Sequence, residues 1–126
     1  MKIGLTACVV VFVAGSAAAQ GALPTDYPAD ATGLKGEEIS SQMAGKVFTV
    51  KTMASGTWRL EFNSRGYLFL DTDSGYSDTG TWRVEDNQWC ANLKKTGGGC
   101  SELRAVGEVL YYKRGTNGEV VSMTVR

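Results

Sequence analysis

From Lys46 to the C-terminus, apolar and polar side chains alternate along the chain, as in strands with one buried face. Glycine-containing or polar turns interrupt the alternation at short intervals. The pattern predicts a mainly β protein with about eight short strands, at residues 46–53, 57–62, 67–72, 79–85, 88–94, 100–106, 109–114 and 119–125. Because the connections are short, we expect an antiparallel meander that closes into a small barrel or curved sheet, with a flattened two-sheet sandwich as the alternative.

The turns test this prediction, because each turn fixes which residues share a face. A two-residue Asp-Asn turn at 86–87 pairs Val84 with Trp89 and places both inward. A type I′ turn at Asn117-Gly118 gives the pairs Tyr112–Met123 and Leu110–Val125. The predicted inward set contains no acid and no lysine; it is Trp58, Leu60, Trp82, Val84, Trp89, Ala91, Leu93, Leu103, Ala105, Leu110, Tyr112, Val121, Met123 and Val125.

The first nineteen residues have the features of a signal peptide. Lys2 is followed by an apolar run over residues 3–13 and by the small residues Ala17-Ala18-Ala19, which predicts a mature start at Gln20. Lipidation at Cys8 and a retained anchor are the alternatives, although the apolar run is shorter than the ~20 residues that span a bilayer. We therefore expect an exported protein, periplasmic or secreted, with no stable membrane span after cleavage.

Two further segments precede the strands. Residues 20–33 contain both prolines and no periodicity, which predicts a flexible leader. Residues 34–44 predict a short helix that presents Ile39 and Met43 on one face and ends at Gly45. Residues 34–126 then form a single β-rich domain.

Composition limits the kinds of catalysis, metal binding and partner that the chain can support. Thirteen basic and thirteen acidic side chains give no net charge, so a nucleic-acid partner is not expected. The chain has no histidine, which excludes Ser-His-Asp and Cys-His catalysis and most zinc sites. Two cysteines remain after signal cleavage, and a Cys90–Cys100 disulfide that faces solvent across a hairpin is the simplest use of them in an exported chain. No catalytic residue, metal or cofactor is predicted.

The hairpin around residues 63–66 leaves large apolar side chains on the outer face. A type I turn followed by a left-handed Gly66 points Tyr67 and Phe69 outward, whereas a four-residue loop points Leu68 and Leu70 outward. Cover by the 34–44 helix is one explanation, and a partner surface or subunit interface is the other.

An acidic segment follows this hairpin. Asp71, Asp73 and Asp78 surround Tyr76, and we interpret the acids as solvated turn carboxylates, with a loose calcium site as the alternative. The EF-hand pattern fails, because its glycine and glutamate positions hold Tyr76 and Trp82. The Gly97-Gly98-Gly99 segment lacks the ending of a phosphate-binding loop and predicts a flexible hairpin tip.

The chain also contains an internal repeat. Gly-Thr-Trp-Arg-Leu-Glu at 56–61 recurs as Gly-Thr-Trp-Arg-Val-Glu at 80–85, 24 residues later, so both copies keep the same inside–outside order. We interpret the repeat as duplicated structure rather than as a duplicated ligand site.

Some motifs resemble known families. The Gly-Thr-Trp-Arg strand at 80–83, Trp89-Cys90 and the glycine-rich approach to Cys100 resemble a domain-of-unknown-function family of small exported proteobacterial proteins. That family has Gly-x-Trp strands and a paired-cysteine hairpin, and it implies no established activity. Gly-x-Trp strands also look like those of calycin barrels, which hold small apolar ligands, although the short strands here predict little room for a lipocalin-sized cavity.

A second resemblance concerns two loops. Residues 74–78 and 112–118 are similar to the loops of periplasmic lysozyme inhibitors, but Asp78 and Asn117 depart from that pattern. The sequence thus predicts a non-catalytic binding module for an apolar ligand or an envelope protein, with Tyr67, Phe69, Asp71, Asp73, Tyr76 and Asp78 as candidate contacts. The alternative is an inhibitor of a hydrolase such as lysozyme or a protease. A monomer is favoured, and a dimer is left open.

Overall fold

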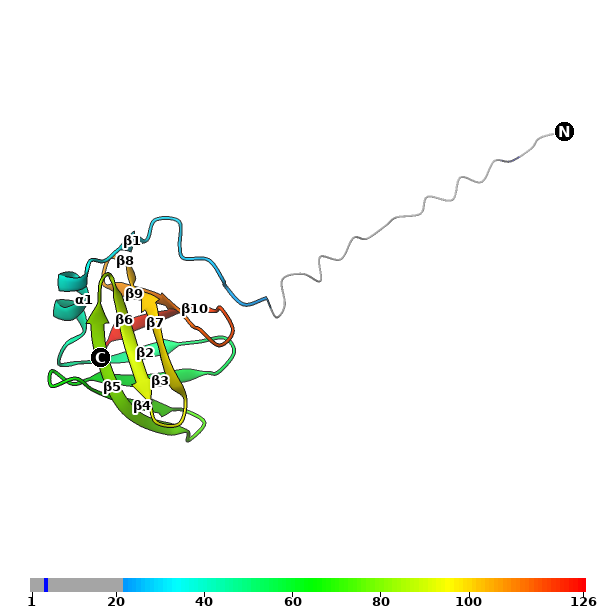
Figure 1. Cartoon of the computed structure of the whole chain (residues 1–126). Helices are drawn as coiled ribbons and strands as arrows, with labels where there is room; N and C mark the ends of the chain where they lie inside the picture. Colours follow the sequence, from blue (N-terminus) through cyan, green and yellow to red (C-terminus); the bar gives the residue numbers. More distant parts are fainter. Residues whose placement is uncertain (1–3, 5–21) are drawn as a thin grey trace.

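The computed structural model describes residue 4 and residues 22–126, so the predicted signal peptide, apart from Gly4, lies outside the described residues, as does Cys8. The described chain forms one antiparallel sheet of ten strands, nearly closed into a barrel, with one short helix beside it (Figure 1). The elements are β1 (Thr32–Gly33), α1 (Gly36–Met43), β2 (Lys46–Lys51), β3 (Thr57–Phe62), β4 (Tyr67–Thr72), β5 (Ser77–Glu85), β6 (Gln88–Leu93), β7 (Gly97–Glu102), β8 (Arg104–Val106), β9 (Val109–Lys113) and β10 (Val120–Val125). The predicted fold class is confirmed.

The strand order closes the barrel by joining the two ends of the β region. The order is β1-β8-β9-β10-β2-β3-β4-β5-β6-β7, so the C-terminal strand β10 lies between β9 and β2. The predicted strand 100–106 is two strands that meet at Leu103. Its first part, β7, pairs with β6, and its second part, β8, pairs with β9. This change of partners, together with β1, accounts for ten strands in place of about eight.

Between β7 and β9 the sheet has a seam that no backbone ladder closes. One side chain bridges the seam: the Ser101 hydroxyl oxygen accepts from the Lys113 N–H at 3.2 Å and donates to the Lys113 carbonyl at 3.1 Å. Among the described residues, the hydrogen bonds between β7 and β9 therefore all involve the Ser101 hydroxyl.

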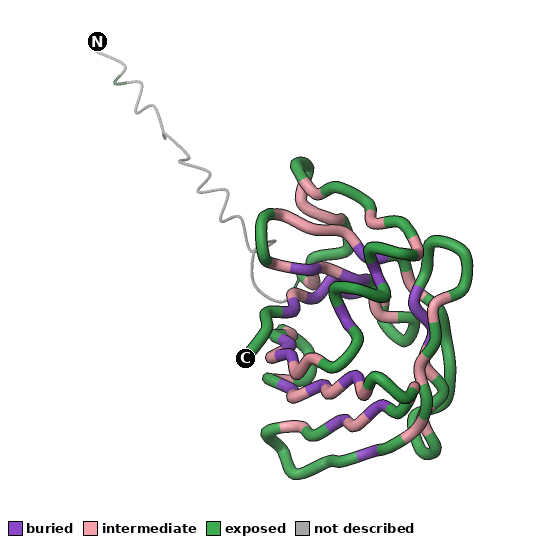
Figure 2. Tube along the Cα trace, turned by 90° about the vertical axis from the view of Figure 1, so that its left-hand side faces the viewer, coloured by how far each residue is buried: buried purple, intermediate pink, exposed green. Residues whose placement is uncertain are grey.

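Two predicted registers are confirmed. Val84 lies opposite Trp89 across the 86–87 turn. Phe62 lies opposite Leu68, with Gly66 at a φ of +93°, so Tyr67 and Phe69 are the outward pair. Burial follows the same order, since buried and less buried residues alternate along the strands in Figure 2.

The register predicted from the Asn117-Gly118 turn is wrong by two residues. Tyr112 lies opposite Val121, and Leu110 lies opposite Met123. A shift of two keeps the same inward face, but it moves Val125 to the sheet end, where its side chain is 54 % exposed. The loop is wider because Glu119, next to Gly118, turns its carboxylate into the protein and accepts from the Met53 N–H at 2.7 Å.

Helix α1 closes one end of the barrel. Its Ile39 and Met43 are fully buried in the same core as Phe48 and Phe62. The helix begins where the Gly36 N–H donates to the Asn87 side-chain oxygen, and it stops at Gly45, whose φ is +75°. The expectation that α1 covers the outer apolar pair is wrong for Tyr67, which is 54 % exposed. An amphipathic helix here stabilises the core rather than the outer face.

Residues 22–33, predicted as a flexible leader, contain a strand that the sequence analysis missed. Thr32–Gly33 pairs with β8, and the Val120 N–H donates to the Pro24 carbonyl at 2.6 Å. The Arg104 guanidinium lies 4.1 Å from the centroid of the Tyr27 ring. These contacts join the segment to the last strands of the barrel, and no periodic pattern in so short a stretch could indicate them.

Candidate functional site

The end of the barrel opposite α1 contains a cavity of about 660 Å³. Its walls are inward side chains of the four strands β3, β4, β6 and β9: Trp58, Leu60, Leu68, Leu70, Trp89, Ala91, Leu93 and Tyr112. This volume lies within the ~300–1,000 Å³ typical of small-molecule sites. The short strands therefore leave room for a cavity of small-molecule size.

The cavity is hollow because one of its walls has no side chains. Gly97, Gly98 and Gly99 line it, and a Cβ placed on Gly99 would meet no atom within 4 Å. These glycines belong to strand β7, so the prediction of a flexible hairpin tip is wrong. At the other end of the barrel, aromatic rings meet edge to face, with Phe62 5.4 Å from Trp82 and 5.5 Å from Trp89. The interior is thus filled at one end and open at the other.

Arg114 lies at the mouth of this cavity. Its guanidinium carbon is 4.6 Å from the centroid of the Trp58 ring, and its Nη1 donates to the Ser55 hydroxyl at 3.2 Å. The same nitrogen lies 3.6 Å from a carboxylate oxygen of Glu119, which is itself buried. Arg114 therefore stays in place because an aromatic face, a hydroxyl and a buried carboxylate hold it from one side.

Tyr112 projects into the cavity from β9, on the same face as Arg114. Its side chain is 7 % exposed, and its ring stands perpendicular to Trp89 at 5.0 Å. Burial raises the pKa of the Tyr112 phenol well above its usual range, although nearby Arg114 acts in the opposite direction. The hydroxyl is therefore a neutral group that can donate one hydrogen bond and accept others.

Asp78, predicted as a solvated turn carboxylate, is buried instead, with 4 % of its surface exposed. Its oxygens accept from the Thr96 N–H at 2.7 Å, the Thr96 hydroxyl at 2.8 Å, and the N–H groups of Lys95 and Thr79. Partial burial acts to raise the pKa of Asp78, but these hydrogen bonds outweigh it and lower the pKa to about 2. Asp78 fixes the β6–β7 turn at the rim of the cavity.

The other predicted contacts lie apart from one another. Asp71 is exposed and lies 3.7 Å from Arg59 on the outer face. Asp73 accepts from the Thr57 N–H at 3.2 Å at the start of β3. The three aspartates thus serve three different backbone or ion-pair contacts, and this arrangement does not favour the calcium alternative. The cluster of possible metal ligands found among the described residues is Glu85, Cys90 and Cys100.

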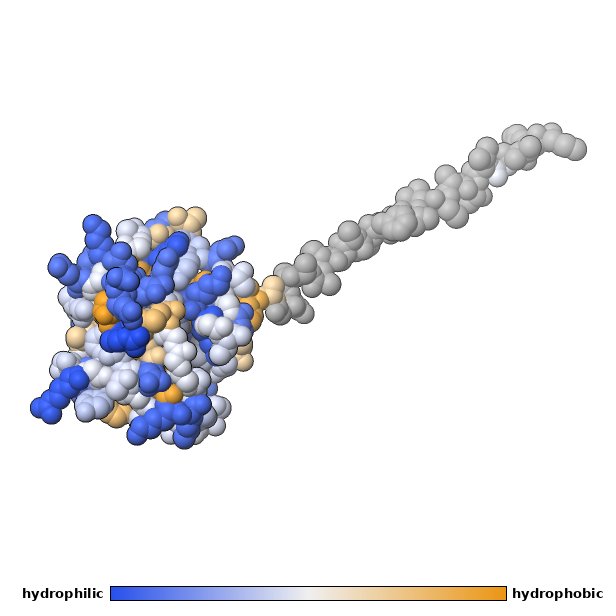
Figure 3. All heavy atoms as spheres, viewed as in Figure 1, coloured by the Kyte–Doolittle hydropathy of each residue, from blue (hydrophilic) through white to orange (hydrophobic). Residues whose placement is uncertain are grey.

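Two of the predicted contacts, Tyr76 and Tyr67, lie at opposite ends of the barrel. Tyr76 lines the cavity mouth, where its hydroxyl lies 2.8 Å from the Thr96 hydroxyl. Tyr67 lies outside, at the end of the barrel that α1 closes, opposite Thr81. Phe69 is on the same outer face, opposite Glu61. The predicted contacts therefore divide between the mouth and the outer surface, which is mostly polar in the view of Figure 3.

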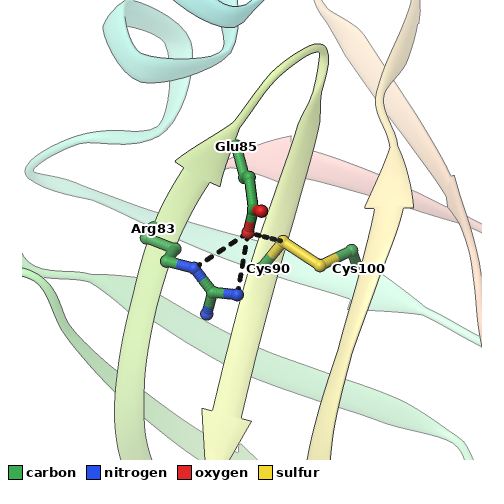
Figure 4. Close-up of a disulfide and its surroundings, with 4 residues drawn as sticks. All are labelled: Arg83, Glu85, Cys90 and Cys100. Atoms are coloured by element: carbon green, nitrogen blue, oxygen red, sulfur yellow. Dashed lines mark hydrogen bonds and ion pairs between the residues drawn. A yellow bond between two sulfur atoms is a disulfide. The ribbon is translucent and has the colours of Figure 1, made fainter.

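The disulfide joins Cys90 and Cys100 directly across β6 and β7, with their Cα atoms 4.0 Å apart (Figure 4). Cys100 is exposed, but Cys90 is only 1 % exposed, so the bond is covered on one side. Glu85 lies 4.0 Å from the Cys90 sulfur and pairs with Arg83 at 2.9 Å. Because the two sulfurs are bonded to each other, the cluster offers a metal ion one carboxylate and no thiolate.

Sequence reasoning missed two features of this site. The predicted inward set contained no acid, yet Asp78 and Glu119 are both buried. Glu119 lies two residues before inward Val121, so alternation along the predicted strand 119–125 would have placed it on the inner face. Arg114, at the end of a predicted strand two residues after inward Tyr112, could have been assigned to the inner face by the same alternation.

No family model, curated protein or solved structure matched this chain. The resemblances to the exported family and to calycin barrels therefore stay predictions. Within the described part of the chain, no helix is both long and apolar enough to cross a membrane.

Proposed function

We propose that this protein is a non-catalytic exported protein, periplasmic or secreted, that binds a small and mainly apolar molecule inside the open end of its barrel. The observation that carries the proposal is the cavity of about 660 Å³, whose walls are aromatic and aliphatic. Burying an apolar molecule there removes surface from water at roughly 25 cal/mol per Å². Apart from the Tyr112 hydroxyl, the walls are mainly apolar, and charged Arg114 stands at the mouth.

The hydrolase-inhibitor alternative depends on the 71–79 and 113–118 loops. Those loops surround the same mouth, with Tyr76 42 % exposed among them. A cationic hydrolase such as lysozyme would be contacted by exposed acids of these loops, but Asp78 is buried and accepts hydrogen bonds from backbone N–H groups. This leaves fewer charged groups for an inhibitory contact and favours the binding module.

Filling the cavity tests the proposal. Gly99→Leu adds an apolar side chain on the inner face of β7, where a Cβ meets open space. Gly33→Leu is the matched control, since Gly33 lies on exposed strand β1 and also has open space at its Cβ. The probe is N-phenyl-1-naphthylamine, a neutral apolar dye whose fluorescence rises on transfer from water into an apolar site.

We expect the wild type and Gly33→Leu to bind the dye with the same micromolar affinity, and Gly99→Leu to bind it at least tenfold more weakly. Urea unfolding should show that both variants remain folded. Absence of dye binding in the wild type, or equal binding by Gly99→Leu, would contradict the proposal. Sub-micromolar inhibition of lysozyme by the wild type would favour the alternative.

A further inference from the structure

Two polar groups in the cavity point to the chemistry of its ligand. The Tyr112 hydroxyl makes no hydrogen bond to any described residue, although the side chain is only 7 % exposed and lines the cavity. A polar group placed among apolar walls without a protein partner is available to a ligand, and a ligand that left it unpaired would incur its desolvation cost.

Arg114 adds a second available donor group on the same strand face. Its Nη1 makes the contacts with Ser55 and Glu119, whereas its Nε and Nη2 have no such contact with a described residue. Tyr112 belongs to β9 and Arg114 lies one residue beyond its end, and both residues line the cavity. The phenol and the guanidinium therefore line one wall of the cavity, the phenol on the barrel side and the guanidinium at the mouth.

The charged side chains that line the cavity are both positive. Its described lining contains Arg114 and Lys113 and no aspartate or glutamate. Asp78 and Glu119 lie close to the rim, but each is buried and already accepts hydrogen bonds from backbone N–H groups. An anion at the mouth would thus meet donors and no exposed carboxylate among the lining residues.

We propose that the ligand is an amphipathic carboxylate, with its carboxylate bound by the Tyr112 hydroxyl and the Arg114 guanidinium and its hydrocarbon part among the apolar walls. This inference rests on the proposed function and specifies the ligand of the same site. An acceptor with two oxygens can take one hydrogen bond from the phenol and another from the planar guanidinium. The hydrocarbon part would contact Trp58 and Trp89, beneath and beside the two polar groups.

The test compares decanoate with methyl decanoate, which keeps the chain and the carbonyl but carries no charge. Both compete with N-phenyl-1-naphthylamine at pH 7.5 for wild type, Tyr112→Phe and Tyr111→Phe. Tyr112→Phe removes only the hydroxyl, which holds no described residue in place, so the fold should be kept. Tyr111→Phe is the matched control, because Tyr111 is the neighbouring residue on the opposite face of β9.

We expect decanoate to bind the wild type at least tenfold more tightly than methyl decanoate. Tyr112→Phe should weaken decanoate about tenfold, in line with the loss of a hydrogen bond to a charged group, while dye affinity changes less than about twofold. Tyr111→Phe should bind all three compounds as the wild type does.

Failure of the inference differs from failure of the proposed function. If the dye binds but decanoate and its ester bind equally, or Tyr112→Phe leaves decanoate binding unchanged, the carboxylate site is wrong and the apolar cavity stands. If neither the dye nor decanoate binds the wild type, the proposed function is wrong as well.

Discussion

The two copies of the Gly-Thr-Trp-Arg repeat keep the same inside–outside order but lie at opposite ends of the barrel. Trp58 stands at the cavity mouth beneath the Arg114 guanidinium. Trp82 stands at the end that α1 closes and packs edge to face against Phe62. Each indole N–H donates to a nearby backbone carbonyl, at 3.0 and 2.8 Å respectively. Identical segments thus border a hollow in one place and a filled core in the other.

The strand registers explain this difference. If the β4–β5 register is continued by one residue, position 82 lies opposite position 66, and in the β3–β4 register position 66 lies opposite position 64. Trp82 is therefore at the height of position 64 and not at the height of Trp58. The second tryptophan is therefore displaced by six residues, roughly 20 Å, along the strand direction from the first. In a barrel of tilted strands, the same local sequence takes a different height on each strand. A repeat in such a fold indicates how a strand packs and not where a ligand binds.

The largest effect should come from emptying the filled end. Phe62→Ala removes a fully buried ring that contacts Phe48, Trp82 and Trp89, and we expect it to lower the free energy of unfolding by about 3–5 kcal/mol. Leu93→Ala, at the cavity, should cost only about 1 kcal/mol, because this side chain already borders open space. Urea unfolding at pH 7 measures both. Equal losses would show that the two ends do not differ in packing.

The next largest difference in stability is expected between alanine substitutions of the two repeat glycines, Gly80 and Gly56. A Cβ on Gly80 would overlap the carbonyl oxygen of Asn92 in β6, so Gly80→Ala must separate two paired strands, and we expect a loss of about 3 kcal/mol. At Gly56, with φ of +72°, the new methyl group meets the end of the Asp73 side chain, which can rotate away. Gly56→Ala should therefore cost about 1–2 kcal/mol, mainly from the left-handed backbone. Thermal unfolding of the pair checks the order, and a more stable Gly80→Ala would reverse it.

The smallest effect concerns the rim of the open end. The pKa of Asp78 is about 2 in the folded protein, below its usual 3.8, so its contribution to stability is present above pH 4 and is lost as pH falls through about 2. Asp78→Asn should lower stability at pH 7 and flatten the decline between pH 4 and pH 2. Asp71→Asn, an exposed surface ion-pair partner, is the control and should change neither. Parallel pH profiles for wild type and Asp78→Asn would contradict this assignment.

Local turn chemistry was sufficient to predict much of the fold. The Asp-Asn turn predicted the register of Val84 with Trp89, and one of the two alternatives for the 63–66 hairpin, the one with a left-handed Gly66, gave the observed pair of Phe62 with Leu68. The Asn-Gly turn failed because Glu119, one residue later, is held by the backbone of a loop 65 residues away along the chain. A turn signal predicts register only where no distant contact competes with it.

The candidate site was harder to predict, because it depends on contacts between residues that are distant in the sequence. Alternation placed Trp58, Trp89 and Tyr112 on the inner face, but it could not show whether their shared space was filled. That depends on the absence of side chains on Gly97–Gly99 and on the placement of α1 at the other end. The sequence also could not predict that the strand 100–106 divides at Leu103 into β7 and β8. An apolar residue at 103 continues the alternation whether or not the strand changes its pairing partner.

The position of the C-terminal strand has a consequence for how the protein folds. Val125 in β10 pairs with Phe48 in β2, so the contact that closes the barrel joins residues 77 positions apart. Forming such a contact requires the closure of a long loop, which slows folding relative to local pairing. Until β10 (Val120–Val125) has paired, β2 and β9 have free edges, and these edges can pair with other chains. The pairing of β10 is therefore the step that turns an open, aggregation-prone sheet into a barrel.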